Sequence, residues 1–238
     1  MNNKIAIVMG EPRSINSEII GKSWIKLNKS EREKIFLIGN FNLFKKQLKQ
    51  NKINISLELI NSFTKIKKSK KLQVFNVPLN KEYILKSINF AHKAALNKII
   101  KGFINCSIDK KKVFKNKKIG MTEFLAKKNK LLGKEGMLIY NKYLSVMPIT
   151  THIDIKNVAK KINSNKIIQK INTLNLFYNN FLKKKPTIAV LGLNPHNNEL
   201  RKNSEENKII IPAIKKLKKQ GLKVIGPFAA DTIFLNKK

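Results

Sequence analysis

Short apolar runs rich in β-branched residues alternate along this chain with longer segments in which apolar residues recur with a helical period. Strands that alternate with helices in this way build a largely parallel sheet with helices packed on it, so the sequence predicts an α/β protein. Asn80 is expected to cap the helix that follows it. We expect strands at 4–9, 34–39, 55–60, 72–77, 102–106, 136–140, 143–149, 187–192 and 222–226, and helices at 17–28, 41–50, 80–100, 154–162, 165–182 and 205–219.

The 238 residues are enough for one large domain or two small ones. Lys and Asn cluster at 107–120, a composition typical of a linker, and we place a boundary there between domains 1–120 and 121–238. No apolar run approaches the roughly 18 residues that a membrane helix needs, so we expect no membrane partner. Cys106 is the only cysteine, which excludes an internal disulfide and fits a reducing cytoplasm.

The formal net charge of +36 at pH 7 raises the question of a polyanionic partner, because contacts from basic residues to phosphates drive nucleic-acid binding. Arginine, however, accounts for only three of the 50 basic residues, and base reading favours arginine's planar fork. The lysines are spread along the chain beside abundant Asn and Ile, as an AT-rich genome would impose on any protein. We expect no nucleic-acid partner, and a lysine-rich polyanion-binding protein stays as an alternative.

The chain contains three histidines. His92 falls within the helical period of 80–100 and is interpreted as a helix-surface or half-buried residue without a functional role. His152 and His196 each follow the carboxyl end of a predicted strand, the edge at which open α/β sheets bind ligands. Their imidazoles can converge on a metal ion such as zinc, or they can be unrelated loop residues. Asp154 is predicted to cap the next helix rather than to bind metal.

The first predicted strand runs into a turn with a single glycine, VMGEPRSINSEII at 8–20, which is too few glycines for a dinucleotide-binding or phosphate-binding loop. A plain connection and a loop that brings Glu11 or backbone N–H groups to a ligand are both compatible with it. Cys106 ends a predicted strand and is interpreted as a small buried residue rather than a nucleophile. The residues by themselves assign no catalytic group and no nicotinamide contact.

Five stretches carry more specific motifs, and in this order they resemble the 4-hydroxythreonine-4-phosphate dehydrogenases over nearly the whole chain. They are IAIVMGEPRSINSEII (5–20), GMTEFLA (120–126), LSVMPITTHIDIKNV (144–158), PTIAVLGLNPHNNE (186–199) and IIIPAIKKLKKQGLKVIGPFAADTIF (209–234). The resemblance implies two α/β/α domains with the active site in a cleft between them, similar to isocitrate and isopropylmalate dehydrogenases. It also implies a homodimer that acts in pyridoxal phosphate biosynthesis.

The same resemblance implies a chemistry. The family oxidises the 3-hydroxyl of 4-phosphooxy-L-threonine with NAD or NADP and a divalent metal (Zn²⁺, Mg²⁺ or Co²⁺), and the β-keto acid then loses CO₂ to give 3-amino-2-oxopropyl phosphate. By position, His152 and His196 match two metal ligands. Thr122 and Lys110 match residues that bind the phosphorylated substrate.

The chain also departs from the family's pattern. Met121 stands where the family has a substrate-binding histidine, Ser14 and Asn16 stand where it prefers glycines, and CSIDK (106–110) lacks the family's Gly-Pro. The family continues past the Ala-Asp-Thr-x-Phe run with the third metal-binding histidine, which the partner subunit provides, and with the last strands. The resemblance therefore implies a C-terminally shortened member. The alternatives are an inactive relative and a dehydrogenase of another phosphorylated four-carbon hydroxy acid.

Overall fold

The computed structural model describes residues 3–114, 120–151, 153–194 and 202–235. Two compact units divide the chain, unit 1 from Met1 to Gly120 and unit 2 from Met121 to Lys238. Each unit has its own sheet and its own buried core, and each is described by itself below.

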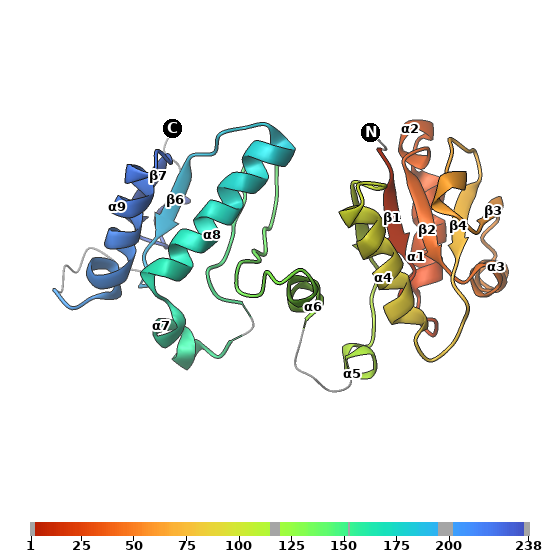
Figure 1. Ribbon diagram of the computed structural model, residues 1–238, viewed down its shortest axis with the longest axis horizontal. Helices are drawn as coiled ribbons and strands as arrows, with labels where there is room; N and C mark the ends of the chain where they lie inside the picture. The colour runs from red at the N-terminus through yellow and green to blue at the C-terminus, as the bar shows by residue number, and fades with distance from the viewer. Residues whose placement is uncertain (1–2, 115–119, 152, 195–201, 236–238) are drawn as a thin grey trace. The chain divides into compact units, whose positions relative to one another are not determined.

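Unit 1 is built on a five-stranded parallel sheet with the strand order β3-β4-β2-β1-β5 (Figure 1). The inner strand β1 pairs on both sides, with β2 and with β5, so that Ile5 lies between Ile35 and Gly102. Strands in the middle of a parallel sheet are covered on both faces, and this explains their continuous apolar runs. The strands are β1 (Ile5–Val8), β2 (Ile35–Gly39), β3 (Leu57–Ile60), β4 (Leu72–Asn76) and β5 (Gly102–Asn105).

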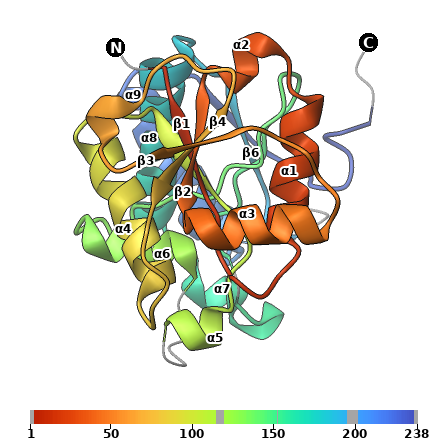
Figure 2. The ribbon, with the colours of Figure 1, turned by 90° about the vertical axis from the view of Figure 1, so that its right-hand side faces the viewer.

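The helices of unit 1 lie on both faces of this sheet (Figure 2). The connections through α1 and α3 lead the chain toward the β3 edge of the sheet, whereas the connection through α4 leads it back to β5 at the other edge. Because these crossovers are right-handed, connections that run in opposite directions place their helices on opposite faces of the sheet. Trp24 of α1 and Phe44 of α3 pack into one core with Leu37 and Val74 of the sheet. The helices are α1 (Asn16–Lys26), α2 (Lys29–Arg32), α3 (Phe41–Gln50), α4 (Tyr83–Leu96) and α5 (Lys110–Val113), with a 3₁₀ turn η1 (Phe63–Lys65).

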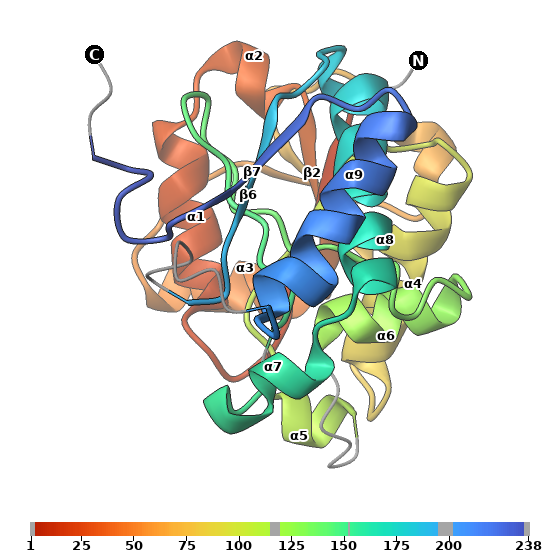
Figure 3. The same ribbon diagram turned by 90° about the vertical axis from the view of Figure 1, so that its left-hand side faces the viewer.

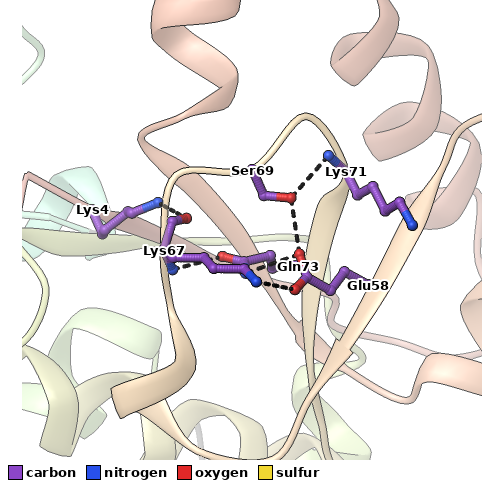
Figure 4. A network of polar contacts seen from close by, with 6 residues as sticks. All are labelled: Lys4, Glu58, Lys67, Ser69, Lys71 and Gln73. Carbon is purple, nitrogen blue, oxygen red and sulfur yellow. Dashed lines mark hydrogen bonds and ion pairs between the residues drawn. The ribbon is translucent and has the colours of Figure 1, made fainter.

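A polar network closes the amino-terminal edge of this sheet (Figure 4). The buried ammonium of Lys4 donates to the carbonyl oxygens of Glu33 (2.6 Å) and Lys67 (2.8 Å). Gln73, which is also buried, accepts from the Lys67 N–H and donates to the Glu58 carboxylate. The network ties the segment between β3 and β4 to the start of β1, so this lysine has a structural role at the edge opposite to the ligand-binding edge of parallel sheets.

Unit 2 has a two-stranded parallel sheet, β6 (Ile188–Leu191) with β7 (Val224–Phe228) (Figure 3). Helices α8 and α9 pack against each other, and α9 packs on β7. Ile171, Ile214 and Leu217 form its core with Val224. The other elements are α6 (Met121–Lys128), η2 (Ile155–Asn157), α7 (Val158–Lys161), α8 (Ser164–Phe177), η3 (Tyr178–Leu182), η4 (Glu206–Ile210) and α9 (Ile211–Lys219).

Two of the predicted strands are wrong. The segments 136–140 and 143–149 contain only one antiparallel bridge, between Ile139 and Val146. Ile139 is 62% exposed and Val146 43% exposed, so the apolar pattern there does not correspond to a covered sheet face. An isolated two-stranded ribbon is marginal in water, because a strand needs partners as well as a pattern.

Two predicted caps also differ from the structure. Asn80 accepts a hydrogen bond from the Glu82 N–H and shapes a turn, whereas α4 begins only at Tyr83. Asp154 does precede a helical turn, but its carboxylate makes no capping hydrogen bond there.

Candidate functional site

The segments before the two candidate metal ligands meet at one pocket of unit 2. This pocket has a volume of about 500 Å³, and Thr150 and Leu193 both line it. His152 and His196 themselves lie outside the described residues. Most residues that line the pocket are apolar, and Ile167 and Val190 are among them. The structure thus brings the chain that precedes each histidine to the same part of unit 2.

A smaller polar cavity of about 30 Å³ lies near the start of α6. Thr122, an exposed residue in the first turn of α6, and Thr151 both line it. Lys170 of α8 is buried beside the cavity, and its ammonium donates to the carbonyl oxygen of Glu135. The volume suits about one water molecule. Thr122 is therefore close to the residue that directly precedes His152.

Glu206 holds the turn that follows β6. Its side chain is buried, and Oε1 accepts hydrogen bonds from the N–H groups of Leu193 (2.9 Å) and Asn194 (3.3 Å). Burial alone raises the pKa of this carboxyl, but hydrogen bonds from its own N–H, from Asn194 and Leu193 and from Ser204 outweigh burial and lower the pKa. The carboxylate is therefore the form that the structure stabilises.

In unit 1 the turn after β1 lies at the carboxyl edge of the sheet, where parallel sheets bind ligands. Gly10 has φ +75°, and a Cβ there would collide with the carbonyl oxygen of Ser107. The buried side chain of Asn16 donates to the carbonyl oxygens of Met9 (2.9 Å) and Ser107 (2.9 Å) and accepts from the Ser107 hydroxyl (2.8 Å). The N–H of Glu11 donates to the same carbonyl of Ser107, so the turn is fixed to the chain after β5.

The remaining candidate residues lie in unit 1. Lys110 is the exposed first residue of α5, directly after Asp109, whose side chain caps that short helix. Cys106 is half-buried against the core, and burial raises the pKa of its thiol, so it does not have the character of an activated nucleophile. His92 lies within helix α4 as expected, but it is buried rather than on the helix surface or half-buried.

Within the described ranges, no group of three or more His, Cys, Asp and Glu side chains is arranged to hold a metal. Both predicted ligands lie outside those ranges, so the metal prediction stays a prediction. None of the helices in the described part of the chain is long and apolar enough to cross a membrane.

Comparison with known proteins places the chain in a family. The family model described as "Pyridoxal phosphate biosynthetic protein PdxA" matches residues 31–238. The chain belongs to this family. The PdxA fold agrees with the predicted α/β architecture and its parallel sheet.

Several relatives and solved structures align with nearly the whole chain. The 4-hydroxythreonine-4-phosphate dehydrogenase of Aquifex aeolicus is 30% identical, and the match covers 99% of this chain and 77% of the relative. That of Sulfurihydrogenibium sp. is 32% identical over 97% of this chain and 76% of the relative. A crystal structure of the Klebsiella pneumoniae 4-hydroxythreonine-4-phosphate dehydrogenase superimposes with a TM-score of 0.87 at 25% identity, covering 98% of this chain and 77% of the other.

None of the five sequence motifs includes Glu206, which holds the turn after β6. One signal was present: Glu206 stands four residues before Ile210, on the same helical stripe as Ala213, Ile214 and Leu217. An acid on the apolar face of a helix must be paired or hydrogen-bonded when that face is buried. The stripe therefore marks a buried carboxylate, although it does not say which groups satisfy it.

Proposed function

We propose that this PdxA protein oxidises the 3-hydroxyl of 4-phosphooxy-L-threonine with NAD or NADP. Loss of CO₂ from the β-keto acid then gives 3-amino-2-oxopropyl phosphate in pyridoxal phosphate biosynthesis. The observation that carries the proposal is that Thr150 and Leu193, which precede the two candidate metal ligands, line one pocket in a chain of this family. The named activity of the relatives supports the substrate and the reaction.

His152 and His196 are the proposed ligands of a divalent metal, Zn²⁺, Mg²⁺ or Co²⁺. Neutral imidazole nitrogens suit zinc and cobalt, so the chemistry of this donor pair fits the group. When bound, the metal polarises the substrate hydroxyl and stabilises the negative charge that develops during decarboxylation. No residue is assigned to the nicotinamide, which supplies the redox chemistry.

Thr122 and Lys110 are the proposed substrate-binding residues. The Thr122 side chain is exposed in the first turn of α6, where its hydroxyl is free to donate to a bound oxygen. Lys110 is exposed in unit 1 and offers an ammonium group to the substrate phosphate. We propose that units 1 and 2 correspond to the two domains of the family. The active protein is proposed to be a homodimer in the cytoplasm.

The test combines metal binding with turnover. Purified protein with Zn²⁺, Mg²⁺ or Co²⁺ and NAD⁺ or NADP⁺ should form reduced nicotinamide from 4-phosphooxy-L-threonine, measured by absorbance. His196→Ala and His152→Ala should lose metal affinity, and His92→Gln, which removes the third imidazole of the chain, should keep it. Unchanged metal affinity in His196→Ala would show that the ligand assignment is wrong, and no turnover with any metal would refute the activity.

Met121 favours a second candidate, a dehydrogenase of another phosphorylated four-carbon hydroxy acid. A thioether is at best a weak acceptor, so it replaces the family's histidine poorly in contact with an anionic substrate. Phosphorylated four-carbon acids that lack the amino group of the first substrate are the compounds to compare. A higher kcat/KM with one of them, together with a reversal of that preference in Met121→His, would establish the second candidate.

A further inference from the structure

Glu206 is an unusual acid in this protein because the partners that lower its pKa are backbone N–H groups and a hydroxyl. The chain has 50 basic residues, yet none of the ion pairs within the described residues includes Glu206. Its donors are the N–H groups of Leu193 and Asn194, its own N–H and Ser204. Burial of a carboxylate costs free energy unless hydrogen-bond donors satisfy it. The buried Glu206 carboxylate therefore favours the backbone conformation that directs these N–H groups toward it.

The two backbone donors lie just past the hydrogen bonds that join β6 to β7. The N–H of Gly192 still donates to Phe228 of β7, at 2.8 Å. The next two N–H groups, those of Leu193 and Asn194, both point to Oε1 of Glu206 instead. Successive N–H groups that converge on one anionic oxygen form a compact anion-binding turn, here occupied by the protein's own carboxylate.

We propose that Glu206 is a positioning residue: its carboxylate sets the direction in which the chain leaves β6, and through it the metal affinity of His196. The part that concerns metal rests on the proposed function. Asn194 is two residues before His196, so the backbone that Glu206 fixes is the last described backbone before the ligand. Removal of a group that hydrogen-bonds to a metal ligand commonly changes metal affinity about 10- to 100-fold, and we take the same range for Glu206, which acts through the backbone before the ligand.

The backbone role is tested by amide hydrogen exchange. Glu206→Ala should speed exchange of the Leu193 and Asn194 amides at least about tenfold, because it removes their acceptor. Glu206→Gln keeps an acceptor oxygen and should fall between wild type and alanine. Glu205→Ala is the matched control: it removes a neighbouring, half-buried acid of equal charge and should leave these amides unchanged. Equal exchange in wild type and Glu206→Ala would overturn the positioning role.

The functional role is tested with Co²⁺ alone, by calorimetry and by its absorption spectrum. Glu206→Ala should weaken Co²⁺ binding about 10- to 100-fold and alter the spectrum, with partial rescue in Glu206→Gln and no change in Glu205→Ala. Leu217→Ala, a core change in the same unit, controls for lost stability and should leave Co²⁺ affinity unaffected. If Glu206→Ala binds Co²⁺ like wild type while His196→Ala does not, the inference is wrong and the proposed function stands. If wild type binds no Co²⁺, the proposed metal site fails and the metal part of the inference fails with it, while hydrogen exchange still decides the backbone role.

Discussion

Replacing Asn16 with alanine is expected to lower the free energy of unfolding of unit 1 by about 3 kcal/mol. Asn16 is 2% exposed and makes three side-chain hydrogen bonds, to Met9 and to the carbonyl and hydroxyl of Ser107. Each bond contributes about 1 kcal/mol net, and a buried group left without a partner costs about 1 to 3 kcal/mol. The Ser107 carbonyl keeps the N–H of Glu11 as a second donor, which holds the expected loss near the sum of the three bonds.

The assay is urea unfolding followed by tryptophan fluorescence. Trp24 is the only tryptophan, it is buried in the core of unit 1, and it therefore reports on that unit alone. Asn51→Ala is the matched control, since Asn51 also makes a side-chain hydrogen bond but is exposed, and it should cost about 0.5 kcal/mol or less. In a double-mutant cycle, Asn16→Ala with Ser107→Ala should show a coupling of about 1 kcal/mol. A loss for Asn16→Ala no larger than that of the control would refute the reasoning.

Three further predictions concern unit 1 and use the same fluorescence assay. Gly10→Ala should destabilise it more than a typical surface change, because alanine at φ +75° is strained and its Cβ meets the Ser107 carbonyl; an unchanged urea midpoint would contradict this. Burial raises the pKa of Tyr83 to about 12, above its ordinary value of 10.0, so the stability it contributes is complete below pH 10.0 and is lost as the pH rises to about 12. Between pH 10.0 and about 12, the free energy of unfolding of wild type should therefore fall by about 2 to 3 kcal/mol more than that of Tyr83→Phe. An equal fall in the two proteins would contradict this prediction. The hydrogen bond from the Ser69 hydroxyl is the largest cause that lowers the pKa of Glu58, and other contacts add to it. Glu58 therefore contributes stability above the ordinary carboxyl pKa, and this stability is lost as the pH falls through the lowered pKa. Ser69→Ala should make this acid loss shallower, and an acid curve identical to that of wild type would count against it.

The fold of unit 1 was predictable because its central strands are buried on both faces. Phe36, Leu37 and Ile38 of β2 are all fully buried, and a strand of that kind must be apolar at every position. The segments 136–140 and 143–149 have the same appearance in sequence, yet Ile139 and Val146 form a single bridge and remain exposed. An apolar run shows that a segment can be buried. A strand also needs a neighbouring strand to pair with, and the rest of the fold determines whether one is present.

The sequence predicted candidate site residues only where a local motif carried them. Thr122 and the two histidines each lie within a contiguous motif. Asn16 and Ser107 are 91 residues apart, and in the sequence they are only two separate departures from the family's pattern. In the structure they are one contact, because Asn16 bonds both the hydroxyl and the carbonyl of Ser107 across the carboxyl edge of the sheet. Side-chain-to-backbone bonds leave no signature in the partner's residue type, since any residue offers a carbonyl or an N–H. Glu206 follows the same rule: Leu193 and Asn194 contribute only their N–H groups, so no pattern in those two residues pointed to the acid that holds them.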